Sequence, residues 1–149
     1  MPGMSQRNSA IKSVITGLVL ALALNQSMAQ QLYQDLGAQT GLQNIIDDLI
    51  PRLQQHPHLQ ASFKETNLKR LRQLLVEQFC ELSGGPCRYS GDEMKAVHAG
   101  LAISELQFNA LVEELQAAMT AQGISSAVQN RLLARLAPMK YQIVNPTKK

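Results

Sequence analysis

The stretch GGPCRYSGDEMKAVHAG, residues 84–100, decides how this chain is expected to fold. It opens on the turn-forming residues Gly84-Gly85-Pro86, continues as a short helical segment and closes on His98, which a small residue and Gly100 follow. Because glycines flank the segment, turns and not a long helix set the direction of the imidazole. An imidazole that such a segment directs over an apolar cavity can act as an iron ligand.

The sequence before this stretch predicts two long helices. The first is expected to begin at Thr40, which can cap it, and to end at residues 56–58, with Pro51 kinking it. The second is expected to follow the cap Thr66-Asn67 and to stop at Gly84-Gly85-Pro86. Apolar residues recur at helical spacing along the two helices, namely Leu42, Ile45, Ile46, Leu49, Ile50 and Leu53, then Leu68, Leu71, Leu74, Leu75, Phe79 and Leu82.

Two more long helices are predicted after residues 84–100. Ser104 with Gln107, and Ser126 with Gln129, each have the spacing of a capping box, in which a serine stands three residues before a glutamine. The chain contains no run of alternating β-branched residues that would predict a strand, and no internal repeat. We therefore expect a single all-α domain with four long helices and one short helix that carries His98.

The N-terminal residues 1–29 have the pattern of an export signal. Arg7 and Lys12 precede a short apolar run that cannot comfortably span a bilayer, and small residues stand at the end of the segment. We expect cleavage after Ala29, which leaves residues 30–149 as a domain of the periplasm that is not inserted in the membrane. An uncleaved N-terminal anchor is the alternative.

The charge of the chain argues against a nucleic-acid partner. The formal net charge is +3, and because Arg7 and Lys12 are the only charged residues of segment 1–29, the remaining domain carries +1. Lys148-Lys149 is most simply a solvated tail. We expect no nucleic-acid binding.

Cys80 and Cys87 are the two cysteines of the chain. In an exported protein an even number of cysteines favours a disulfide, which here would link the end of the second helix to the turn after it. A metal pair or a redox dithiol is the alternative, but both prefer a tighter spacing, and no histidine adjoins either thiol.

His98 is either an iron ligand or an ordinary residue, since a lone histidine in a helical protein is ordinarily a core or surface residue. Three features favour a ligand: the flanking glycines, more inward apolar residues than four helices need for one another, and Phe63, a ring in a polar linker that suits clamping a flat molecule. A porphyrin needs an apolar slot, one axial base and cations near its propionates. The remaining alternative is a haem-free helical module with His98 in its core.

The same residues resemble a known family. They are Leu32-Tyr33, Leu36-Gly37, Asp47-Asp48, Phe63, Thr66-Asn67, Gly84-Gly85-Pro86, Tyr89, Gly91, Met94-Lys95 and Val97-His98-Ala99-Gly100. Their order and spacing resemble those of the group I truncated haemoglobins, over residues 32 to 144. The resemblance implies a two-over-two helical sandwich around one b-type haem per chain.

The resemblance also implies roles for individual residues. His98 would be the proximal iron ligand and Phe63 would pack on the porphyrin, while Arg70 or Lys95 would reach a propionate. The residues that would line the haem slot are Leu68, Leu71, Leu75, Phe79 and Met94.

The distal side departs from the family pattern. Members usually carry a phenylalanine-tyrosine pair on the first long helix. The tyrosine hydroxyl holds dioxygen, often with the help of a glutamine on the next helix. Here Leu49 and Ile50 occupy the positions of the pair, and Leu71 and Leu75 occupy the distal positions of the next helix. Gln73 and Gln78 are expected to point away from the inward stripe. An aliphatic side chain therefore stands at each position where family members carry a hydrogen-bond donor.

The missing donor predicts weak retention of dioxygen. A charge-assisted hydrogen bond is worth about 1.5–3 kcal/mol, so its loss should speed oxygen release roughly ten- to a hundredfold. Carbon monoxide and nitric oxide depend less on such a donor. We expect a five-coordinate ferrous haem.

Two functional classes follow. The first, which we favour, is a haemoprotein that binds oxygen, nitric oxide or carbon monoxide as carrier, scavenger or sensor, with a periplasmic electron donor keeping the iron ferrous. The second is a haem enzyme, either a nitric oxide dioxygenase or a peroxidase-like protein. Dioxygenation needs a long-lived oxygen adduct, to which this pocket is badly suited, and peroxide cleavage needs a distal base or cation, which the pocket lacks. No catalytic residue is predicted, and the oligomeric state is left open.

Overall fold

The computed structural model describes residues 30–144, and the expected export signal lies outside this range. Residues 30–35 are helical, and no strand occurs between residues 30 and 144. The remaining helices are α2 (Ala38–Gln55), α3 (Gln60–Phe63), α4 (Leu68–Leu82), α5 (Met94–Val97), α6 (Glu105–Ala121), α7 (Ser126–Leu136), a 3₁₀ turn (Ala137–Met139) and α8 (Lys140–Ile143). The all-α class and the four long helices predicted from the sequence are confirmed. None of the helices in the described range is long and apolar enough to cross a bilayer.

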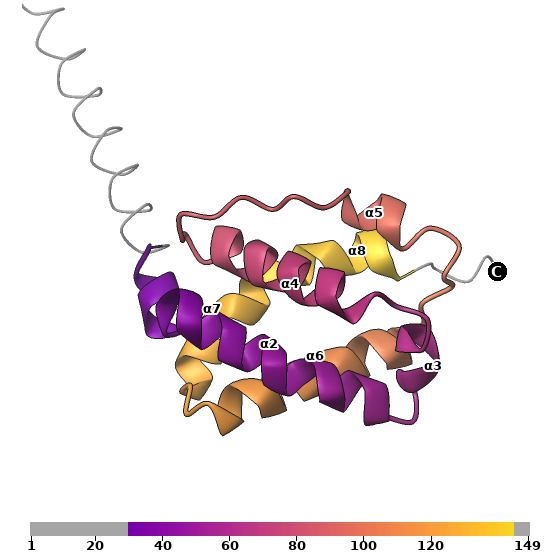
Figure 1. The fold of residues 1–149 in the computed structure, drawn as a ribbon, viewed down its shortest axis with the longest axis horizontal. Coiled ribbons are helices and arrows are strands. Elements are labelled where there is room, and N and C mark those ends of the chain that lie inside the picture. The colour runs from indigo at the N-terminus through magenta and orange to yellow at the C-terminus, as the bar shows by residue number, and fades with distance from the viewer. Residues whose placement is uncertain (1–29, 145–149) are drawn as a thin grey trace, which may run out of the picture.

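The four long helices form two layers. Helix α2 packs against both α4 and α6, while α7 packs against α4 and α6. Figure 1 shows α2 and α4 as one pair, with α6 and α7 behind them. The short helix α5 packs against α8 at the far end of the chain. This arrangement is a two-over-two helical sandwich.

The core lies between these layers. Its largest fully buried apolar side chains are Leu32, Leu36, Leu42, Ile45, Ile46, Leu49, Leu53, Cys80, Leu115, Met119 and Leu132. The apolar stripe predicted for the first long helix is therefore inward as expected, except that Ile50 is half-buried at its edge. Burial of this apolar surface is the main term that stabilises the fold.

Helix ends are defined by local hydrogen bonds, and two of the predicted caps are confirmed. The Asn67 side chain accepts a hydrogen bond from the backbone N–H of Arg70 at the start of α4. Ser104 and Gln107 form a reciprocal capping box at the start of α6. Both devices satisfy N–H groups that the first helical turn leaves without partners.

Three local predictions were wrong. Helix α2 begins before Thr40, because Gly37 in a left-handed conformation (φ 83°) accepts the hydrogen bond that starts the helix. Phe63 ends the short helix α3 and does not lie in an irregular linker. Ser125, not Ser126, precedes α7, and Gln129 closes no capping box because its buried amide donates to the Thr120 hydroxyl and a backbone carbonyl.

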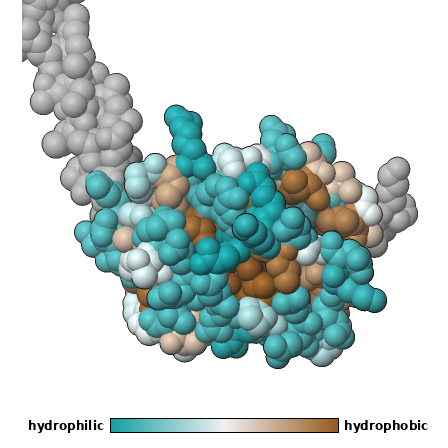
Figure 2. Space-filling view, viewed as in Figure 1, coloured by the Kyte–Doolittle hydropathy of each residue, from teal (hydrophilic) through white to brown (hydrophobic). Residues whose placement is uncertain are grey.

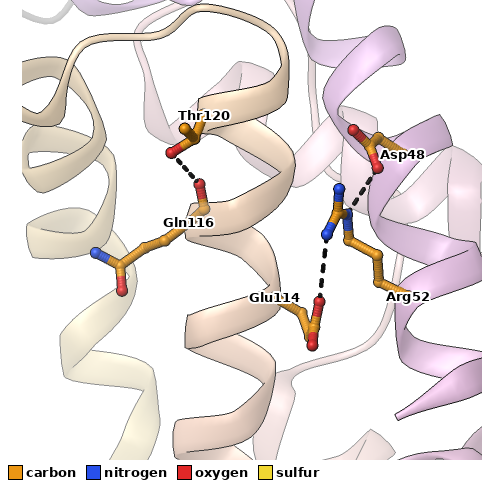
Figure 3. Close-up of polar contacts among 5 residues, drawn as sticks. All are labelled: Asp48, Arg52, Glu114, Gln116 and Thr120. Atoms are coloured by element: carbon orange, nitrogen blue, oxygen red, sulfur yellow. Dashed lines mark hydrogen bonds and ion pairs between the residues drawn. The ribbon is translucent and has the colours of Figure 1, made fainter.

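Polar contacts tie the partner helices together at the surface. Arg52 on α2 forms ion pairs with Asp48 (2.7 Å) on its own helix and with Glu114 (3.7 Å) on α6. Figure 3 shows the Arg52 guanidinium between the two carboxylates, with Thr120 further along α6 donating to the Gln116 carbonyl. Partly exposed pairs such as these contribute little stability, so they help to fix the register of α2 on α6 without driving folding.

Candidate haem site

The orientation of the His98 ring is set by a local hydrogen bond. His98 follows α5 as its C-terminal cap, and its Nδ1 atom lies 2.8 Å from the Met94 carbonyl oxygen. A carbonyl oxygen can only accept, so Nδ1 must carry the proton. The neutral ring then presents a free lone pair at Nε2, for which the described part of the chain supplies no partner. This is the tautomer that an iron ligand requires.

Apolar side chains around His98 remain exposed. His98 itself is half-buried, whereas the exposed fractions of Val97 and Leu101 are 41% and 58%. Leu106, on α6, and Tyr141, on α8, are also exposed. Figure 2 shows several apolar patches separated by polar side chains on the side of the molecule that it presents. Large exposed apolar groups next to a free imidazole mark a surface suited to a flat apolar ligand.

A cavity of about 530 Å³ lies beside this segment, among α4, α5, α8 and the loop before α5. Its lining residues are Gln78, Glu81, Leu82, Tyr89, Glu93, Met94, Lys95, Met139 and Gln142. Of the predicted slot residues, Met94 lines this cavity. Phe63 lines a second cavity, of about 440 Å³, at the end of α2.

Gln78 corrects one expectation. Its side chain was expected to point away from the inward stripe, but Gln78 is 7% exposed and lines the first cavity. Its amide Nε2 donates to the Met94 sulfur (3.4 Å) and to the Met139 sulfur (3.7 Å). The signal was present in the sequence, because residue 78 follows Leu71 by seven and Leu75 by three residues and so shares their helix face.

The predicted distal residues are aliphatic and packed beside the core. Leu49 is buried, while Ile50, Leu71 and Leu75 are half-buried. Ile50, Leu75 and Phe63 pack against the core cluster, and Phe79 belongs to it; Leu68 is half-buried. Contact of these residues with a porphyrin stays a prediction.

The donor set fits haem better than a bare metal ion. No group of three or more His, Cys, Asp or Glu side chains that could hold a metal occurs in the described residues. A protein-only metal centre needs several such ligands. Haem brings four nitrogen ligands of its own and asks the protein for one axial base, which His98 can provide.

The loop before α5 is fastened to α4. Cys80 near the end of α4 is bonded to Cys87, as predicted, with their Cα atoms 5.7 Å apart. Gly85 lies against this bridge so closely that a Cβ atom there would stand 2.6 Å from the Cys80 sulfur. Further along, the Ser90 hydroxyl and backbone N–H donate to the Glu77 carboxylate, which lowers the pKa of Glu77.

Reduction of the Cys80–Cys87 bridge is expected to lower the free energy of unfolding by about 2 kcal/mol, because the bridge closes a short loop in the unfolded chain. Urea unfolding with and without a reductant measures the difference. The double variant Cys80→Ser/Cys87→Ser should match the reduced protein and should not respond to the reductant. Equal unfolding midpoints for the oxidised and reduced protein would contradict the prediction.

Comparison with known proteins agrees with this geometry. The sequence model of the bacterial-like globin family matches residues 31–145. The group 1 truncated haemoglobin GlbN of Mycolicibacterium paratuberculosis is 32% identical over 99 residues, which are 66% of this chain and 73% of that protein. The chain belongs to the group I truncated haemoglobins. GlbN of a Nostoc species is 31% identical over 101 residues, 68% of this chain and 86% of the relative.

Solved structures show the same fold. The Fe(III) form of the truncated haemoglobin of Tetrahymena pyriformis superposes with a TM-score of 0.74 at 22% identity, covering 77% of this chain and 98% of that one. The group II truncated haemoglobin of Bacillus anthracis gives a TM-score of 0.69 at 20% identity, covering 79% and 93%. Membership of the truncated haemoglobins implies a haem cofactor and small gaseous ligands.

Proposed function

We propose that this truncated haemoglobin binds one haem b per chain through His98 and reversibly binds a diatomic gas on the opposite, aliphatic side. The observation that carries the proposal is the hydrogen bond from His98 Nδ1 to the Met94 carbonyl, because it places the proton of a neutral ring on Nδ1 and directs the Nε2 lone pair to iron. Haem, when bound, supplies an iron centre with one position open to a gas. Action in the periplasm, after loss of residues 1–29, is part of the same proposal.

The distal side chains determine which gas is retained. Ile50, Leu71 and Leu75 carry no polar hydrogen, so they offer a ligand apolar contact and no hydrogen bond. Dioxygen gains more from a donor than carbon monoxide or nitric oxide does. A pocket of this composition therefore favours the last two gases, and the absence of a base or cation at these three positions supports ligand binding over a haem enzyme.

Optical spectra of the full chain in the ferric, ferrous and carbon monoxide states test the proposal. We expect a Soret band that reaches its maximum at one haem per chain, and a ferrous spectrum typical of five-coordinate haem, because no side chain at the distal positions can ligate iron. Absence of a Soret band would overturn haem binding. A six-coordinate ferrous spectrum without added ligand would overturn the aliphatic distal pocket.

A further inference from the structure

Residues 83–93, which we call the strap, lie along α4 before they lead into α5. Cys87 is bonded to Cys80, and the Ser90 amide and hydroxyl reach Glu77 one turn earlier on α4. Arg70, two turns earlier again, donates to the Ser90 carbonyl (3.3 Å). Cys87 and Tyr89 contact the end of α4 at Cys80 and Glu81, whereas Ser90 contacts Glu77 and Arg70 earlier on α4, so the strap runs antiparallel to the helix (Figure 1).

Glu77 makes the strongest polar contacts of the strap. Its Oε2 atom accepts hydrogen bonds from the Ser90 backbone N–H (2.9 Å) and from the Ser90 hydroxyl (2.6 Å). Its Oε1 atom accepts one from the Gln73 amide (2.7 Å) on the same helix. Hydrogen bonds to an ionised carboxylate are roughly twice as strong as those between neutral groups. Glu77 therefore binds both the backbone N–H and the side-chain hydroxyl of Ser90.

The chain between Ser90 and His98 has little freedom. The Tyr89 hydroxyl donates to the Asp92 carbonyl (3.1 Å) across Gly91, where a Cβ atom would stand 2.3 Å from that hydroxyl. Helix α5 follows directly, and the Met94 carbonyl accepts from both the His98 backbone N–H (3.2 Å) and its ring. A displacement of Ser90 therefore moves the imidazole relative to α4.

We propose that Glu77 is a positioning residue for His98, acting through Ser90 and the strap. The inference rests on the proposed function, since it concerns the imidazole that would hold iron. No hydrogen bond joins Glu77 to His98 in the described residues. Glu77 instead affects the position of the imidazole relative to α4, which forms the other wall of the slot.

The test compares Glu77→Gln, Ser90→Ala and their double variant with the unsubstituted full chain. Glu77→Gln keeps the side-chain shape and removes the charge, and Glu113→Gln, on the exposed face of α6, is the matched control. We expect Glu77→Gln and Ser90→Ala each to release haem roughly three- to tenfold faster. The effect of the double variant should be smaller than the sum of the two single effects, because both substitutions remove the hydrogen bond from the Ser90 hydroxyl to the Glu77 carboxylate. The iron–histidine stretching band in resonance Raman spectra should shift in all three and stay in place in the control.

A second readout needs no haem. In the haem-free protein, amide hydrogen exchange of residues 94–98 should be faster in Glu77→Gln and Ser90→Ala, while exchange within α2 stays unchanged. Unchanged exchange, haem release and band position in both single variants would overturn the positioning role, as would additive effects in the double variant. If the unsubstituted chain takes up no haem, the proposed function fails instead, and the exchange measurement still decides whether Glu77 holds the segment.

Discussion

His98→Ala is expected to lower haem affinity by at least about a hundredfold. The loss of a residue that merely orients a metal ligand typically costs 10–100-fold in affinity, and this substitution removes the axial ligand itself. Of the three histidines, His98 is the one whose Nδ1 atom donates to a backbone carbonyl, whereas His56 Nδ1 accepts a hydrogen bond from the His58 backbone. Titration of the haem-free protein with haem, followed at the Soret band, measures the change.

Controls separate ligation from general damage. His56→Ala is the matched variant, since that histidine lies at the end of α2 and its ring accepts a hydrogen bond from the His58 backbone. It should bind haem as the unsubstituted protein does. Free imidazole added to the His98→Ala protein should restore part of the Soret absorbance by occupying the vacated position. Haem uptake by His98→Ala with an unchanged spectrum would disprove ligation by this residue.

Ile50→Tyr is expected to slow oxygen dissociation roughly ten- to a hundredfold. Ile50 is half-buried on α2 at the edge of the core, and the resemblance described above predicts that it occupies the position of the distal tyrosine. A hydroxyl there would supply the donor that the pocket lacks, and a charge-assisted hydrogen bond is worth about 1.5–3 kcal/mol. Stopped-flow mixing of the oxygenated protein with carbon monoxide measures the rate of oxygen release.

Ile50→Phe is the control for size, because it has the same ring without the hydroxyl. Oxygen release from this variant should stay close to that of the unsubstituted protein, and carbon monoxide release should change little in either variant. Equal slowing in Ile50→Tyr and Ile50→Phe would attribute the effect to steric closure. An unsubstituted protein that already releases oxygen slowly would show that a donor reaches the pocket from elsewhere.

Gln78 is the residue from which such a donor would come. Its amide is buried and donates only to thioether sulfurs, which are weak acceptors. Gln78 lines the first cavity, so we assign it to the wall of that cavity. Gln78→Leu would remove the amide while keeping a similar volume.

The sequence by itself determined the features that depend on residues a few positions apart. Asn67 and Ser104 cap their helices through bonds that span three residues, the apolar stripe of α2 follows from helical spacing, and the Cys80–Cys87 bridge joins neighbours in the chain. His98 was identifiable because glycines and a short helix surround it. Its proton-holding bond to Met94 spans a single helical turn.

Only the tertiary structure decided the contacts between elements that the sequence leaves far apart. The hydrogen bonds between Glu77 and Ser90 depend on the strap turning back along α4. The Gln78 amide donates to the sulfur of Met139, sixty-one positions further along the chain. Gln129, predicted to form a capping box with Ser126, is buried instead, and its amide donates to the Thr120 hydroxyl near the end of α6 and to the Ile124 carbonyl in the loop after it. The physical reason is the same in each case: a polar side chain bonds to the partner that packing brings within hydrogen-bonding distance, and local spacing carries no information about that packing.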